Sequence, residues 1–259
     1  MIRALLCAVV FAASCAHAAV KLSDDEALRV GRKIWQNEAG GSVERLTHWN
    51  EGENFASLGI GHFIWYKKGE PGPFTESFPG LLDFYAAKGV AIPAWLRGSP
   101  SCPWKDKAQF EAEFHSARTD ELRKLLEGTV GVQARYAADR LENALPKILA
   151  SVPAAERASL QARFDRVAAV PNGIYALMDY VNFKGEGVSL TERYKGEGWG
   201  LLQVLQGMQD SPAGPPAVEE FSKSADAALT RRVANSDPAR NEARWLPGWR
   251  KRLKTYLND

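Results

Sequence analysis

The stretch Glu51-Gly-Glu-Asn-Phe-Ala-Ser-Leu-Gly-Ile-Gly-His62 decides how the fold of this chain is interpreted. It begins with two carboxylates, Glu51 and Glu53, continues as an apolar segment spaced by glycines, and ends on a histidine. A third carboxylate, Glu38, lies a short way upstream. A surface loop explains the charges but not why they bracket an apolar segment. The pattern predicts a small β region at about residues 47–66, in which glycines mark turns or close backbone approach.

A helix is predicted just before this region. Its start is marked by Ser23-Asp24-Asp25-Glu26, a capping box, and its end by Gly40 and Gly41. Glu38 lies near the end of this helix, in line with its apolar stripe (Ala27, Val30 and Ile34). Burial and the negative end of the helix dipole both predict a raised pKa for this carboxyl, as a general acid needs. The alternative is a frayed helix end with a solvated Glu38.

The rest of the chain is predicted to be helical. Residues 105–169 are rich in Ala, Glu, Arg and Leu and are interpreted as an extra helical lobe or insertion. Pro171-Asn172-Gly173 is interpreted as a turn before a helix that is apolar nearly all round and ends at Lys184. Further helices are expected from about Trp199, over 218–233 and after Trp249. The fold class expected is therefore α+β, mainly α-helical.

The order of these features resembles the catalytic region of phage-type lysozymes (muramidases). In that family the catalytic Glu ends the first helix, and a second carboxylate lies six residues before the Thr of Thr-Ile-Gly-Ile-Gly-His. Here the run Ser57–His62 matches that motif, Glu51 lies six residues before Ser57, and Glu38 takes the first position. The chain departs from the family in two ways: the interval from Glu38 to Glu51 is longer, and the second carboxylate is Glu rather than Asp.

Two later segments are similar to the family more weakly. Tyr180–Gly187, which contains Asn182, is similar to the end of the family's central helix, and Arg244–Arg252 is similar to its closing segment rich in Trp and Arg. The resemblance covers Ser23 to about Phe63 and then about Ile174 onward, so the 105–169 segment is unmatched. It implies one lysozyme-like domain over 19–259 with a helical insertion at about 105–169.

The resemblance implies hydrolysis of the N-acetylmuramic acid–N-acetylglucosamine backbone of peptidoglycan. Glu38 is then the general acid, Glu51 an ionised carboxylate that acts as base, and Ser57 a hydroxyl that holds the attacking water. Glu53 is the alternative second carboxylate, and His62 is expected to brace the loop by hydrogen bonding. The residues expected to bind substrate are Glu53, His62, Trp49 and Asn182.

Two other functions remain open at this point. A lytic transglycosylase needs only one acid, Glu38, because the sugar expels its neighbour by internal cyclisation. A catalytically silent glycan-binding protein of the cell wall would keep the site and lose turnover. The Glu at position 51 and the longer interval before it leave this second alternative possible.

The first eighteen residues read as a secretory signal peptide. Arg3 is followed by a short apolar run, and Ala16-His17-Ala18 is a small-x-small cleavage site. A rival interpretation is a lipoprotein signal with Cys15 as the lipidated residue. The mature protein is therefore expected to be periplasmic or secreted. Cys102 is the one cysteine outside this segment, which excludes an intramolecular disulfide in the mature chain.

Composition narrows the expected partners. The 259 residues carry a formal net charge of +2, too balanced to indicate nucleic acid. Histidine and cysteine spacing predicts no metal site, and no motif predicts a cofactor. Downstream of the signal no apolar run is long enough for a transmembrane segment. We expect a monomer whose partner is peptidoglycan or a related aminosugar polymer, with some of the eight tryptophans suited to sugar rings.

Overall fold

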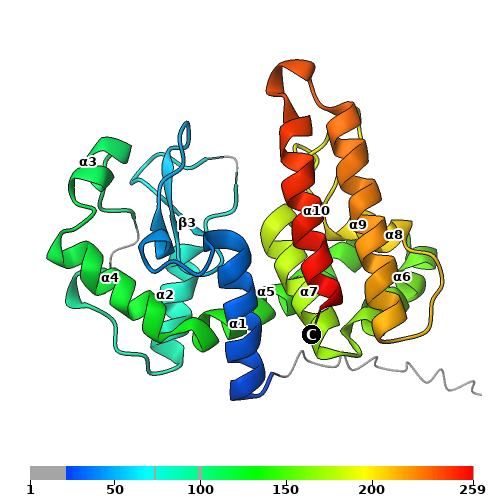
Figure 1. The fold of residues 1–259 in the computed structure, drawn as a ribbon, viewed down its shortest axis with the longest axis horizontal. Coiled ribbons are helices and arrows are strands. Elements are labelled where there is room, and N and C mark those ends of the chain that lie inside the picture. The colour runs from blue at the N-terminus through cyan, green and yellow to red at the C-terminus, as the bar shows by residue number, and fades with distance from the viewer. Residues whose placement is uncertain (1–21, 73, 99–100, 259) are drawn as a thin grey trace, which may run out of the picture.

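The protein is mainly α-helical with one small antiparallel sheet (Figure 1). The structure, a computed structural model, describes residues 22–72, 74–98 and 101–258. The expected signal peptide and Cys15 lie outside these residues. The α-helices are α1 (Asp24–Ala39), α2 (Phe78–Ala87), α3 (Lys107–Ala112), α4 (Ala117–Gly128), α5 (Val130–Ala150), α6 (Ala154–Ala168), α7 (Pro171–Lys184), α8 (Leu201–Gly207), α9 (Pro215–Asn235) and α10 (Leu246–Lys254). Short 3-10 turns are η1 (Glu44–Leu46), η2 (Ala94–Leu96), η3 (Pro238–Arg240), η4 (Glu242–Trp245) and η5 (Thr255–Leu257).

Helix α1 begins and ends where its sequence predicts. The Ser23 side chain accepts from the backbone of Glu26, and the Glu26 carboxylate accepts from the backbone of Ser23, so the capping box is confirmed. Gly40 has a φ of 61°, a left-handed conformation that costs glycine little, and it ends the helix. The buried face carries Ala27, Val30 and Ile34, which brings the last turn of α1 into the interior.

The predicted β region is confirmed as a three-stranded antiparallel sheet in the order β1-β2-β3. The strands are β1 (Thr47–His48), β2 (Phe55–Leu58) and β3 (Phe63–Tyr66). Register decides which side chains share a face, because partners directly opposite point the same way. His48 pairs with Ser57, and Ser57 pairs with Ile64, so these three side chains lie on one face. The other face, which carries Leu58, Phe63 and Trp65, is fully buried in the core.

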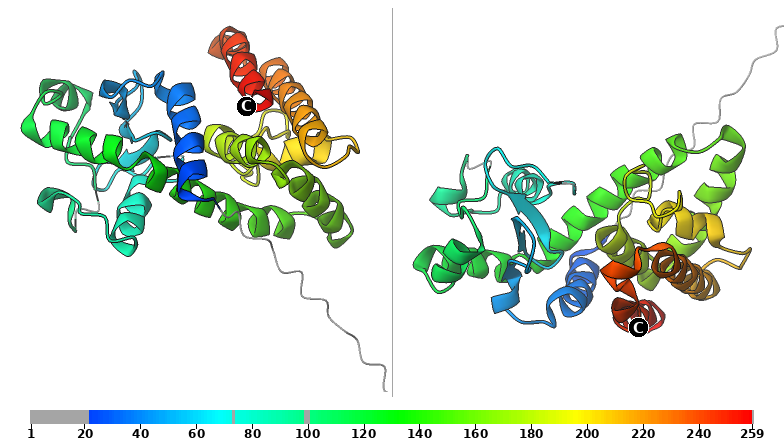
Figure 2. Two further views of the ribbon diagram at one scale, coloured as in Figure 1. Left: turned by 60° about the horizontal axis from the view of Figure 1, so that its bottom comes forward. Right: turned by 90° about the horizontal axis from the view of Figure 1, so that it is seen from above.

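Helix α5 connects the two ends of the molecule. Figure 2 shows it running from the group that contains the sheet, α2 and α4 to the group that contains α6–α10. It packs along α1 and also against α2, α6 and α7. The 105–169 segment is helical, as expected. Its apolar side chains belong to the same hydrophobic core as those of α1, the sheet and α7.

Helix α7 is buried nearly all round, as its sequence predicts. The turn expected at Pro171-Asn172-Gly173 is wrong, because these residues form the first turn of α7. Proline suits this position, since the first amides of a helix have no intrahelical acceptor. Gly173 allows close packing there, because a Cβ would lie 1.7 Å from the carbonyl oxygen of Val167. Within the described ranges, no helix is both long enough and apolar enough to cross a membrane.

Candidate active site

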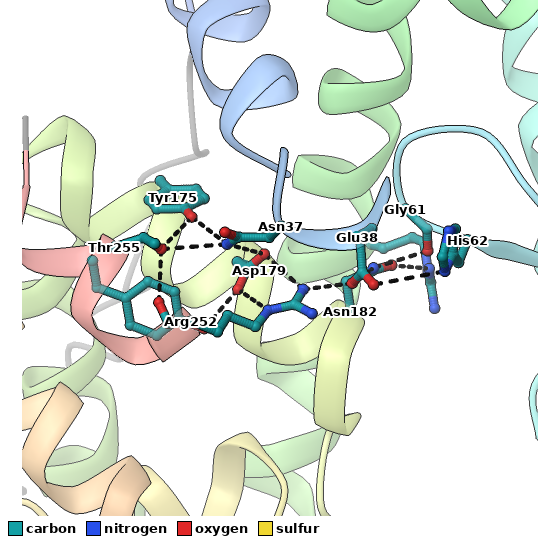
Figure 3. A network of polar contacts seen from close by, with 11 residues as sticks. Asn37, Glu38, Gly61, His62, Tyr175, Asp179, Asn182, Arg252 and Thr255 are labelled. Carbon is teal, nitrogen blue, oxygen red and sulfur yellow. Dashed lines mark hydrogen bonds and ion pairs between the residues drawn. The ribbon is translucent and has the colours of Figure 1, made fainter. Parts of the chain in front are cut away.

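Glu38 lies where four parts of the fold meet. It belongs to the last turn of α1 and retains 14% side-chain exposure. Its Oε1 accepts from Arg252 of α10 at 2.5 Å and from Asn182 of α7 at 3.4 Å. Its Oε2 lies 3.7 Å from Nδ1 of His62, in the turn between β2 and β3. The carboxylate that the sequence singles out is therefore held by side chains from distant segments, as Figure 3 shows.

Arg252 is itself anchored by a second carboxylate, that of Asp179. Its Nε and Nη2 donate to the two oxygens of Asp179 at 2.7 and 2.8 Å, a two-point pair. Asp179 is fully buried and also accepts from the hydroxyl of Tyr256 at 2.7 Å. Burying a charge is costly unless it is paired and hydrogen-bonded, and here Asp179 is both. This arrangement fixes the guanidinium beside Glu38 (Figure 3).

The pKa of Glu38 is lowered, so the expected raised pKa is wrong. Burial alone raises it, as the sequence suggests, but the charge of Arg252 and then that of His62 outweigh burial. Hydrogen bonds from Arg252 and Asn182 act in the same direction. Glu38 is therefore ionised in the free protein at neutral pH. The helix position revealed the burial, but the lowered pKa depends on Arg252, more than two hundred positions away.

The glycine-spaced turn is held against α5 and α7 by its backbone. The amide of Ile60 donates to Oε1 of the buried Gln133 at 2.9 Å. The carbonyl of Gly61 accepts from Asn182 at 2.9 Å, and this same amide group contacts Glu38. Gly59 has a φ of 72°, and a Cβ there would lie 2.3 Å from Gln133. The glycines therefore allow the turn to approach α5 closely and so place His62 near Glu38.

His62 is held in an unusual conformation. Its φ of 46° is left-handed, a region that residues other than glycine rarely adopt. Burial is the largest cause that lowers its pKa, while the charge of Glu38 acts to raise it. Its Nε2 is buried and has no hydrogen-bond partner among the described residues. The ring stacks on His48 at 6.1 Å between centroids, so His62 joins Glu38 to the face of the sheet that carries His48 and Ser57.

Glu51 lies away from this network. Its side chain is 91% exposed and forms an ion pair with Lys107 at the start of α3. That hydrogen bond and the charge of Lys107 lower the pKa of Glu51, as expected for a carboxylate that stays ionised. Its contacts are thus with α3, and none of them is to Glu38 or to its partners.

Glu53 is connected to the site through a line of polar side chains. Its carboxylate accepts from Asn50 at 2.8 Å, and Asn50 contacts Nε2 of His48 at 2.9 Å. Burial is the largest effect on Glu53 and raises its pKa. Of the two candidate second carboxylates, Glu53 is therefore the one linked through His48 and His62 toward Glu38.

The remaining expected site residues have different positions. Ser57 is buried in β2 and shares its face with His48. Asn182 contacts Glu38 directly. Trp49 is 3% exposed, packs on Phe110 and donates to the carbonyl of Glu53, so it supports the loop from within and leaves no face open to a sugar.

Sequence reasoning did not single out Asp179 or Gln133, and it noted Arg252 only as part of the closing segment. Asp179 carried a usable signal, since it is the only acidic residue in an apolar helix and lies three positions before Asn182 on the same face. Gln133 carried none, because its amphipathic helix gives no hint of which loop it contacts.

Among the residues with described positions, no group of three His, Cys, Asp or Glu side chains is arranged to hold a metal ion. Comparison of the chain with protein-family models, curated proteins and solved structures finds no match.

Proposed function

We propose that this protein is a lysozyme-like enzyme that cleaves the glycan backbone of peptidoglycan with Glu38 as the proton donor. One observation carries the proposal: Glu38 is a largely buried carboxylate on which Arg252, Asn182 and His62 converge from three other segments. Cleavage of a glycosidic bond needs a carboxylic acid beside the leaving oxygen. The resemblance of the Ser57–His62 run to the lysozyme motif supports the same assignment.

The lowered pKa of Glu38 requires that the acid gain its proton when substrate binds. A glycan over the carboxylate would exclude water and favour the neutral form. Arg252 opposes protonation of Glu38 less than an isolated cation would, because its charge is shared with Asp179. His62 carries a ring nitrogen at 3.7 Å and is the nearest described group able to exchange a proton with Glu38.

Hydrolysis with inversion needs a second carboxylate that activates water, at about 6.5–9.5 Å from the acid. Glu53 suits this role better than Glu51, because it belongs to the polar line Asn50–His48 that leads to His62. Ser57 shares the face of His48, and its hydroxyl is the candidate for holding the water.

A lytic transglycosylase is the second candidate. It is favoured by the exposed position of Glu51 and its ion pair with Lys107, since that mechanism needs Glu38 alone. A silent glycan-binding protein would keep the same geometry without turnover.

Digestion of purified peptidoglycan by the wild type and by Glu38→Gln, with mass analysis of the products, tests these readings. Reducing ends indicate a hydrolase, and anhydro ends indicate a transglycosylase. Binding without any product in the wild type would contradict the enzymatic proposal and support the silent binder. Undiminished cleavage by Glu38→Gln would contradict the assignment of the acid.

A further inference from the structure

Lys184, at the end of α7, is a partly buried cation without a carboxylate partner. Its Nζ lies 3.9 Å from the centre of the Phe183 ring and 3.8 Å from that of Trp249. It makes no ion pair with any residue in the described ranges. An ammonium group removed from water costs free energy unless a charge or hydrogen bonds compensate, and two aromatic rings compensate only in part.

The neighbouring charges are already committed to one another. Arg252 binds Glu38 and Asp179. Arg232 donates to Glu242 at 2.7 Å. Burial, and after it the charges of Arg232 and Arg252, lower the pKa of Lys184 well below its ordinary value, while Glu242 and Glu38 act to raise it. Glu242 and Glu38 thus compensate burial and the two arginine charges at Lys184 only in part.

This position is adjacent to Glu38. The Phe183 ring contacts Lys184 and also the guanidinium of Arg252, whose Cζ lies 4.1 Å from the ring centre. Arg252 in turn binds Glu38. A group bound to Lys184 would therefore be separated from Arg252 by the Phe183 ring, and Arg252 binds Glu38.

We propose that Lys184 and Trp249 form a subsite for a carboxylate of the peptidoglycan strand. This subsite rests on the proposed function, and it would distinguish peptidoglycan from a neutral aminosugar polymer. N-acetylmuramic acid carries a lactyl ether that ends in a carboxyl group, and a peptide attached there carries further carboxylates. A polymer of N-acetylglucosamine carries none. A lysine ammonium suits a single carboxylate, and the Trp249 ring offers an apolar surface beside it.

The subsite has a consequence for the acid. A carboxylate bound at Lys184 and Trp249 would oppose the positive potential that Lys184 and Arg252 create at Glu38. The pKa of Glu38 would then rise when a muramyl strand is bound, which favours uptake from solvent of the proton that the free protein lacks. A neutral glycan would exclude water from Glu38 but would not make this electrostatic contribution.

The test measures binding in the Glu38→Gln background, so that no probe is cleaved. Three tetrasaccharides are titrated by calorimetry: a peptidoglycan fragment with its peptides, the same fragment after amidase treatment, and neutral chitotetraose. Lys184→Met should weaken binding of at least one carboxylate-bearing fragment about tenfold and binding of chitotetraose less than twofold. Loss on the amidase-treated fragment identifies the lactyl carboxyl, and loss only on the untreated fragment identifies the peptide.

Two controls separate this result from misfolding. Lys251→Met removes an exposed lysine of α10 and should leave all three affinities unchanged, and Lys184→Arg should retain most of the preference for carboxylate. If Lys184→Met does not fold, the ¹⁵Nζ resonance of Lys184 is followed in protein that keeps the lysine, and it should shift with the carboxylate-bearing fragments only. Equal losses on all three probes, no loss on any, or no binding of any probe would overturn the subsite. Failure of the wild type to cleave peptidoglycan would overturn the proposed function separately.

Discussion

Arg252 donates from Nε and Nη2 to both oxygens of Asp179, and the same Nη2 also donates to Glu38. One guanidinium thus joins a fully buried structural carboxylate to the proposed catalytic one. The contact of Glu38 with Arg252 explains why Glu38 is ionised although it is largely buried. It also makes the stability of α7 and α10 depend on the group that holds the acid.

Glu38→Gln should lower lytic activity by at least about 100-fold while the fold is retained, because the amide keeps the shape of the side chain and removes the proton. Turbidity loss of purified cell wall measures activity, and circular dichroism measures folding. Glu127→Gln is the matched control, because Glu127 is an exposed residue of α4. Equal activity of the two variants would contradict the assignment.

Arg252→Met should lower the free energy of unfolding by about 3–5 kcal/mol, because it leaves Asp179 buried without its ion pair. Urea unfolding measures the change. Arg135→Met removes the partner of Asp24, whose carboxylate is exposed, and should cost less than about 1 kcal/mol. A loss for Arg252→Met as small as that for Arg135→Met would mean that water or another donor compensates Asp179.

Glu53→Gln should reduce hydrolysis more than Glu51→Gln does, if the products carry reducing ends. The physical reason is that Glu53 is linked through Asn50 and His48 toward His62, whereas Glu51 is exposed and paired with Lys107. Initial rates on one peptidoglycan preparation provide the comparison. The reverse order would return the second carboxylate to Glu51, and no effect of either variant would support a mechanism with one acid.

The pairing of Glu242 with Arg232 predicts that the protein loses stability in acid. Burial raises its pKa, but the hydrogen bonds and charge of Arg232 and the hydroxyl of Tyr194 outweigh burial and lower the pKa to about 2. A carboxyl whose pKa is lower in the folded state stabilises the fold above its unfolded value of 4.5, and this contribution is lost as the pH falls from there toward about 2. The free energy of unfolding in urea should therefore decrease from pH 6 to pH 3, and Arg232→Met should make that decrease smaller. An unchanged pH dependence in Arg232→Met would contradict the pairing.

Gly59→Ala should destabilise the protein more than Gly52→Ala. Both glycines have a positive φ, 72° and 78°, so alanine at either costs about 1–2 kcal/mol of backbone strain. At Gly52 a Cβ meets no atom within 4 Å, whereas at Gly59 it lies 2.3 Å from Gln133. Thermal unfolding of the two variants measures how much the contact with Gln133 adds to the backbone strain. Equal decreases in melting temperature would show that Gln133 moves aside without cost.

The sequence predicts the local parts of this molecule well. The capping box at Ser23, the glycines after α1, the β region at 47–66 and the buried helix before Lys184 all depend on neighbouring residues, and the structure has each of them. It also predicts that Glu38 lies at a buried helix end.

What the sequence could not supply are the long-range partners. The first helix alone predicts a raised pKa for Glu38, because nothing in that helix indicates that Arg252 will contact it. The packing of the helices at 105–169 is likewise not predictable, because an amphipathic helix does not show which surface it covers. Trp49 has the flat aromatic ring that suits a sugar, but its contact with Phe110, which is distant in the sequence, buries it.

The contact between Glu38 and Arg252 spans 214 positions of the chain. Because the first helix emerges long before α10 is synthesised, the proposed acid is complete in sequence but lacks its strongest partner for most of translation. A chain interrupted before α10 would keep the sheet, the glycine turn and Glu38 itself, yet would leave the Asp179 charge uncompensated and the carboxylate without its anchor. During synthesis the site can therefore be assembled only after α10 has emerged, so an unfinished copy of this protein is expected to lack it.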